Sequence, residues 1–214
     1  PKPVYNKVEI PRGGEYALVL SDGTKVHLNS MSSLRFPVAF TTGKREVELQ
    51  GEAYFEVSKT GQPFIVNANG MQVEVLGTTF NISAYPDEEY QTTLVNGSVK
   101  VSAEKGESLI LKPSQQATIA LGSNSIQVRT VDTSFYTSWV KGKINFKDQR
   151  LEDIMKTLSR WYDMNVVYEN EKLKNIRFGC NLNRYEEITP FVKLLEKTEE
   201  VHVKIEGNTI TFHN

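Results

Sequence analysis

Short runs of alternating hydrophobic and polar residues fill residues 1 to about 130 of the chain. Successive side chains of a strand point to opposite faces, so a half-buried strand buries every second residue. No stretch of this region repeats its hydrophobic residues at the helical period. The alternation is carried by Tyr16/Leu18/Leu20, Val47/Leu49, Phe55/Val57, Val73/Val75, Val99/Val101, Leu109/Leu111 and Ile126/Val128. We therefore predict a large antiparallel all-β domain over residues 1–135, built as a sandwich, a barrel or stacked hairpins.

Turn-forming residues separate these runs. Ser21-Asp22-Gly23 and Lys105-Gly106 each stand between two predicted strands. Asn96-Gly97 lies between Thr92–Val95 and Ser98–Val101. Both residues of an Asn-Gly pair tolerate positive φ, so this position predicts a two-residue type I′ hairpin.

The pattern changes to a mixture of helices and strands over residues 136–214. Asp148 is the predicted N-cap of an amphipathic helix whose buried stripe is Leu151, Ile154, Met155, Leu158 and Tyr162. Thr189 and Pro190 suit the start of a second helix. The predicted strands are Gly142–Phe146, Asn165–Tyr168, Ile176–Leu182, Val201–Ile205 and Thr209–His213. The order β-α-β-β-α-β-β predicts a small α+β domain with one sheet and both helices on one face.

Composition narrows the functional classes. The formal net charge is −1 and the longest Lys/Arg run is Lys44-Arg45, which argues against nucleic-acid binding and against attraction to an anionic membrane. Cys180 is the one cysteine, so an intrachain disulfide and a zinc site built from cysteines are excluded. No run approaches 18 apolar residues, so we expect no membrane insertion by this fragment.

Few residues have the spacing that catalysis or metal binding requires. His27, His202 and His213 are far apart in sequence, and no nucleophile motif is present. We predict no enzymatic activity, no metal and no cofactor. Two alternatives stay open, a glycoside hydrolase that uses paired carboxylates and a carbohydrate-binding β module that stacks sugars on aromatic rings. Their candidate residues are Glu46, Glu48, Glu52 and Glu56 for the first, and Trp139, Trp161, Tyr162 and Phe178 for the second.

A series of motifs resembles the FecR family of membrane-anchored anti-sigma regulators. The central one is Val47-Glu48-Leu49-Gln50-Gly51-Glu52-Ala53-Tyr54-Phe55-Glu56-Val57. Around it, in family order, stand Pro11-Arg12-Gly13-Gly14, Leu20-Ser21-Asp22-Gly23-Thr24, Pro63-Phe64-Ile65-Val66, Val75-Leu76-Gly77-Thr78-Thr79-Phe80-Asn81, Leu94-Val95-Asn96-Gly97-Ser98-Val99 and Leu111-Lys112-Pro113-Ser114-Gln115-Gln116-Ala117. Ser114 departs from the pattern because a turn glycine is common there, and Thr79 replaces a longer polar residue.

The later part of the chain extends the resemblance. Trp139, Gly142, Phe146, Leu151, Arg160-Trp161-Tyr162 and Phe178 look like the C-terminal domain of Bacteroidetes members. That domain is similar to the short secretin/TonB N-terminal signalling fold.

The resemblance implies a role in cell-surface signalling. This chain would be the periplasmic region of a single-pass inner-membrane protein. Its partners would be the N-terminal signalling domain of a TonB-dependent outer-membrane transducer and, through a cytoplasmic segment outside this sequence, an extracytoplasmic-function (ECF) sigma factor that directs transcription.

The resemblance also points to a self-cleavage site at the bond between Gly77 and Thr78. Some members cleave themselves at a Gly–Thr bond in this motif. The Thr78 hydroxyl would attack the preceding carbonyl, and water would open the resulting ester. The alternative interpretation is that Gly77 only marks a bend or bulge between strands.

A partner-binding surface is predicted on the last strand. Thr209, Thr211 and His213 alternate with Ile210 and Phe212, so one face of the strand is polar. A final hairpin strand is often at a sheet edge, where it can pair with a strand of another protein. We therefore predict that the transducer docks at Thr209, Thr211 and His213.

Overall fold

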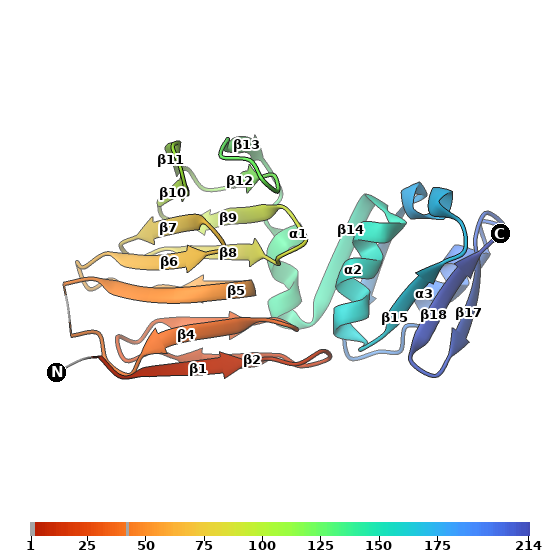
Figure 1. The fold of residues 1–214 in the computed structure, drawn as a ribbon, viewed down its shortest axis with the longest axis horizontal. Helices are drawn as coiled ribbons and strands as arrows, with labels where there is room; N and C mark the ends of the chain where they lie inside the picture. Colours follow the sequence, from red (N-terminus) through yellow and green to blue (C-terminus); the bar gives the residue numbers. More distant parts are fainter. Residues whose placement is uncertain (1–2, 42) are drawn as a thin grey trace. The chain divides into compact units, whose positions relative to one another are not determined.

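The computed structural model describes residues 3–41 and 43–214 and divides into two compact units (Figure 1). The large unit extends to Thr137 and the small unit runs from Ser138 to Asn214. The fold is mainly β with a smaller α+β part, which confirms the predicted fold class. The division into domains at residues 1–135 and 136–214 stays a prediction.

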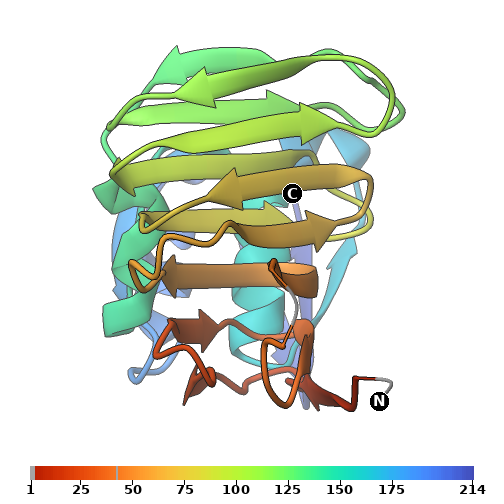
Figure 2. The same ribbon diagram turned by 90° about the vertical axis from the view of Figure 1, so that its left-hand side faces the viewer.

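One continuous 13-stranded sheet forms the large unit, and it folds back on itself into two layers. Figure 2 shows its strands stacked in chain order from the red N-terminal end to the green hairpins. The first layer consists of β1 (Tyr5–Glu9), β4 (Ser33–Pro37), the first half of β5 (Arg45–Glu56), β6 (Phe64–Ala68), β7 (Met71–Val75), β10 (Val99–Ala103) and β11 (Ser108–Leu111). The second consists of β2 (Tyr16–Val19), β3 (Lys25–Leu28), the second half of β5, β8 (Thr79–Ala84), β9 (Tyr90–Asn96), β12 (Gln115–Ile119) and β13 (Gln127–Thr130).

Strand β5 belongs to both layers because the chain turns at Gly51. Residues before Gly51 pair with β4 and β6, whereas residues from Gly51 onward pair with β3 and β8. Gly51 has φ +89°, and a Cβ atom there would lie 2.7 Å from the Cα of Ser32. Only glycine fits both the backbone angle and the close approach. The two alternating runs around Val47 and Phe55 are therefore one strand.

The core of the large unit lies between the layers. Phe55 of β5 stacks on Phe80 of β8, with ring centres 5.1 Å apart, and lies 6.0 Å from Phe64 of β6 in the opposite layer. All three rings are completely buried. Burying one such side chain stabilises a fold by about 1.5–3 kcal/mol. The alternating residues of both layers thus meet in one core.

Most predicted turns connect paired strands, but the one at Asn96-Gly97 does not. Strand β9 pairs with β8 and β12, whereas β10 pairs with β7 and β11. The predicted type I′ hairpin is therefore wrong, and this turn is a corner that carries the chain between layers. Only Gly97 of the pair has positive φ, at +98°. The other Asn-Gly pair, Asn69-Gly70, has φ of +46° and +84° and joins the paired strands β6 and β7.

The small unit has the predicted order of helices and strands. After α1 (Ser134–Thr137) at the end of the large unit, its elements are the 3₁₀ turn η1 (Ser138–Lys141), β14 (Lys143–Arg150), α2 (Leu151–Trp161), β15 (Asn165–Tyr168), η2 (Glu171–Asn175), β16 (Arg177–Asn183), α3 (Thr189–Glu196), β17 (His202–Glu206) and β18 (Thr209–His213). They form two sheets rather than one, because β16 pairs with β14 while β15 pairs with β18. The predicted stripe of α2 is buried, except that Tyr162 follows the helix and is only partly buried.

The predicted N-cap of α2 is wrong. Asp148 lies in β14 at a register shift, has φ +50°, and binds Arg177 with 2.9 Å between Oδ1 and Nε. The helix begins at Leu151, whose N–H donates to the carbonyl of Ile176 at 2.7 Å. Backbone pairing thus supplies the acceptor that a capping side chain would otherwise provide.

Candidate functional site

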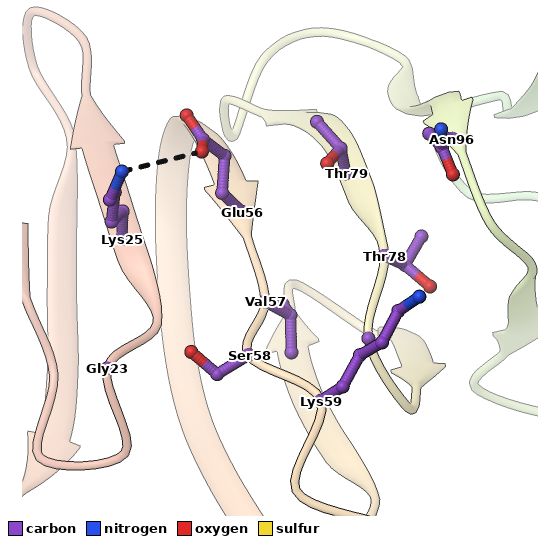
Figure 3. Close-up of a pocket in the computed structure, with 10 residues that line it drawn as sticks. Gly23, Lys25, Glu56, Val57, Ser58, Lys59, Thr78, Thr79 and Asn96 are labelled. Atoms are coloured by element: carbon purple, nitrogen blue, oxygen red, sulfur yellow. Dashed lines mark ion pairs between the residues drawn. The ribbon is translucent and has the colours of Figure 1, made fainter.

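The segment Leu76-Gly77-Thr78 forms a corner between β7 in the first layer and β8 in the second. A hollow of about 400 Å³ lies on one side of it, lined mainly by polar residues that include Lys25, Glu56 and Lys59 (Figure 3). A second hollow of about 290 Å³ is lined by Leu76, Lys100 and Ile110 among others. Gly77 and Thr78 line both hollows. The predicted cleavage bond is therefore the feature that the two hollows share.

A buried arginine holds this corner against its neighbours. Arg45 is 1% exposed and forms an ion pair with Asp22, with 2.6 Å between Nη1 and Oδ2. The guanidinium also donates to the backbone carbonyls of Ser58 at 2.8 Å, Gln62 at 2.6 Å and Leu76 at 3.3 Å. A buried charge is tolerated when it is paired and hydrogen-bonded. Arg45 thus links Leu76, the residue before Gly77, to the turn at Asp22 and to the loop that contains Ser58 and Gln62.

The corner is closely packed around Gly77 and Thr78. A Cβ atom on Gly77 would lie 2.2 Å from Cγ of Lys59, so a larger residue would displace that side chain. The Thr78 hydroxyl donates to the carbonyl of Ser98 at 3.0 Å, and the Thr78 carbonyl accepts from Val57 N–H at 3.0 Å. The register of β8 with β9 shifts immediately afterwards, between Thr79 and Phe80. Close packing against Lys59 accounts for a glycine at position 77.

The same geometry bears on the chemistry of the bond. Thr78 is 5% exposed, so its hydroxyl is largely shielded from bulk water. Its proton is directed to a neutral carbonyl, which is not a base that could accept it during attack on Gly77. Lys59 lines the same hollow and points toward Thr78 (Figure 3). Self-cleavage would require the hydroxyl to leave Ser98 and turn toward the carbonyl of Gly77, and it stays a prediction.

The second predicted site, on β18, lies elsewhere in its sheet than expected. The strand order is β15-β18-β17, so β18 is the central strand and the expectation of an edge is wrong. The cause is the parallel pairing of β15 with β18 from Asn165↔Thr209 to Tyr168↔Phe212. Strand addition by a partner is therefore not available at β18. Thr209, Thr211 and His213 do share the half-buried outer face, opposite the buried Ile210 and Phe212.

The carboxylates proposed for hydrolysis have separate polar partners. Glu48 pairs with Arg35 and Glu56 with Lys25. Glu46 accepts from the side chain of Asn67, and Glu52 accepts from two asparagine side chains, Asn29 and Asn81. Each of the four carboxylates therefore has its own polar partners, and these contacts do not form the pair of facing carboxylates that a glycoside hydrolase needs.

The aromatic residues proposed for sugar stacking are mostly interior. Trp139, Trp161 and Phe178 are buried, and Tyr162 is partly buried. Burial also raises the pKa of the Cys180 thiol to about 11, so this cysteine is a poor nucleophile at neutral pH.

Among residues 3–41 and 43–214, no three His, Cys, Asp or Glu side chains gather to hold a metal ion. In the same part of the chain, no helix has the length and apolar character needed to cross a membrane.

Sequence reasoning missed Arg45 and Asp22. Both have polar sequence neighbours, and an arginine at a strand start is usually exposed. The one available signal was the alternation itself, because Arg45 has the same parity as the buried Val47 and Leu49.

Comparison with known proteins covers both units. The model of the family described as "FecR protein" matches residues 6–100, and that described as "FecR, C-terminal" matches residues 143–212. Two crystal structures of a protein provisionally described as an anti-sigma factor from Parabacteroides distasonis ATCC 8503 are similar, each with a TM-score of 0.89. One is 26% identical and covers 98% of this chain and 99% of its own; the other is 25% identical and covers 99% of each. No curated protein matches the chain.

Proposed function

Because the chain belongs to the FecR family, we propose that it is the periplasmic sensor of a single-pass inner-membrane anti-sigma factor. In this proposal it receives a signal from a TonB-dependent outer-membrane transducer. It relays that signal to an ECF sigma factor through a cytoplasmic segment outside this sequence.

The observation that carries the proposal is the similarity to a whole anti-sigma-factor chain. The likeness extends over nearly the full length of both chains and includes both units. An anti-sigma-factor sensor role is thereby supported. The identities of the transducer and the sigma factor belong to the proposal.

We place the transducer contact on the outer face of β18. Thr209, Thr211 and His213 lie side by side there, and the neighbouring strands widen the face. Because β18 is central, its backbone is already paired, and binding would use side chains rather than strand addition. Support for this site is the half-buried polar face itself, together with the predicted similarity of this unit to the transducer's own signalling domain.

The experiment measures binding of the transducer's isolated signalling domain by calorimetry. Thr211→Lys places a long charged side chain on the face without removing a backbone donor, and should weaken binding roughly tenfold, which is about 1.4 kcal/mol. Ser102→Lys, at a half-buried position on β10 of the other unit, is the matched control and should bind as the unmodified chain does.

Two outcomes separate the parts of the proposal. If the unmodified chain does not bind the signalling domain, the relay from the transducer is contradicted. If it binds and Thr211→Lys has no effect, only the docking face is contradicted. A sigma-dependent reporter in cells carrying the full-length protein gives the corresponding readout of function.

A further inference from the structure

The outer face of the sheet β15-β18-β17 brings together two histidines that are far apart in sequence. His202 of β17 and His213 of β18 are direct partners in the antiparallel register. Directly opposed residues of an antiparallel pair point to the same face. Their ring centres are 5.6 Å apart and their planes are inclined by 36°. His202 is exposed and His213 is half-buried, so both rings can be reached from solvent.

This spacing is close to what a shared metal ion requires. Imidazole nitrogens bind first-row metal ions at about 2.0–2.1 Å, so two rings on one ion at a right or tetrahedral angle have centres roughly 4.5–5 Å apart. A small rotation of the exposed His202 ring covers the difference. The strand pairing fixes the two backbones, so little chain entropy is lost when the rings converge on an ion.

The hydrogen bonding of His213 favours one ring nitrogen as the ligand. Nδ1 lies 3.3 Å from the backbone oxygen of Asn214. The tautomer that donates from Nδ1 to this oxygen leaves the lone pair of Nε2 for a metal ion. A backbone acceptor behind the ring in this way orients many metal-binding histidines.

The neighbouring charges are compatible with a bound cation. Lys204 is on the same face as His202, two residues along β17, but it pairs with Glu206 at 2.9 Å. On the other side of His213, the ladder continues to Glu169, whose N–H donates to the Phe212 carbonyl at 3.0 Å. The described residues do not gather a third protein ligand around the two rings.

We propose that His202 and His213 form a two-histidine surface site for a divalent first-row transition metal ion. Water completes the coordination. Imidazole ligands suit Cu²⁺, Ni²⁺ and Zn²⁺ and not the hard ions Mg²⁺ and Ca²⁺, and affinity should follow the order in which Cu²⁺ is strongest. The proposal does not depend on transducer binding.

The test titrates the untagged protein with Cu²⁺, Ni²⁺, Zn²⁺ and Mg²⁺ alone in a buffer that does not bind metals. We expect one Cu²⁺ per chain, weaker Ni²⁺ and Zn²⁺ binding, and no Mg²⁺ binding. His202→Ala and His213→Ala should each weaken Cu²⁺ binding by at least the roughly 10–100-fold that loss of a supporting hydrogen bond costs a metal site. His27→Ala is the matched control because His27 is the remaining histidine of the three in the chain, and it should bind normally.

A second readout locates the ion directly. Paramagnetic Cu²⁺ at a low ratio to protein should broaden the imidazole NMR signals of His202 and His213 and leave those of His27 sharp. Far-UV circular dichroism of the variants establishes that the sheet is intact. The proposal is overturned if Cu²⁺ broadens all three histidines equally, or if the folded double variant His202→Ala/His213→Ala binds Cu²⁺ as the unmodified chain does.

Discussion

Ser114 has a backbone conformation that its side chain disfavours. It lies in the turn before β12 with φ +66°, in the left-handed region. Its N–H donates to the Leu94 carbonyl and its own carbonyl accepts from Val131, both within 3.0 Å. Two strands on either side therefore fix the backbone, and the turn has the geometry that a glycine would adopt.

Replacing Ser114 by glycine should stabilise the protein. A left-handed conformation costs a non-glycine residue about 1–2 kcal/mol, while glycine costs about 0.5–1 kcal/mol in chain entropy. We expect a net gain of about 0.5–1 kcal/mol in the free energy of unfolding, measured by urea denaturation. Ser114→Ala keeps the Cβ atom and should give no gain. A Ser114→Gly protein no more stable than the unmodified one would contradict the strain argument.

At the scale of elements, hydrophobic alternation predicted strands well but not their partners. The two Asn-Gly pairs illustrate the limit. Asn69-Gly70 closes a type I′-like hairpin, whereas Asn96-Gly97, with the same residues, forms a corner between layers. What differs is the pairing of the flanking strands with distant parts of the chain, and no local signal encodes it.

The same limit explains the position of β18. The hairpin with β17 was predictable from the turn at Gly207, but the parallel partner β15 is more than 40 positions away. The N-cap of α2 also depended on a distant residue, because Ile176 accepts from the first helical N–H. Pairing between residues distant in sequence thus determined the position of β18 and the start of α2, which local propensity did not determine.

Thr211→Pro tests the central position of β18. Proline lacks the N–H that a central strand uses, and the unpaired acceptor alone costs about 1–3 kcal/mol. We expect faster hydrogen exchange across β15, β17 and β18. Val128→Pro in β13 is the control. Among the described residues β13 pairs with β12 alone, and the Val131 N–H donates to the Ser114 carbonyl. Because successive N–H groups of a strand alternate in direction, the Val128 N–H points away from β12. Native-like exchange of β18 in Thr211→Pro would mean that β18 is not central.

At the scale of the whole molecule, the family resemblance predicted a function, which the pattern of hydrophobic and polar residues did not. Alternation and turns predicted two kinds of architecture but gave no function. The buried ion pair between Arg45 and Asp22 was not predictable from the sequence. Arg45 contacts three turns that are distant in sequence. The Gly77–Thr78 motif was visible in the sequence, whereas its place between two hollows depends on both layers of the sheet.

Cleavage between Gly77 and Thr78 would leave two pieces that remain one folded body. Strand β5 on one side of the cut pairs with β8 on the other, and β7 pairs with β10. Phe55 and Phe80, which stack in the core, also come from opposite sides. The interface between the pieces is therefore the interior of the large unit, and breaking one corner removes none of its strand pairs.

Self-cleavage at this bond predicts that aged protein gives two masses, for residues 1–77 and 78–214, which sum to the intact mass plus one water. The Thr78 oxygen would attack the Gly77 carbonyl carbon, the peptide C–N bond would break as the nitrogen gains a proton, and water would then hydrolyse the ester. Intact mass spectrometry of fresh and aged protein measures this, and size-exclusion chromatography without denaturant should still show one species. Thr78→Val keeps the shape without the hydroxyl and should stay whole. One full-length mass at both times would exclude self-cleavage, and pieces that separate without denaturant would contradict the shared core.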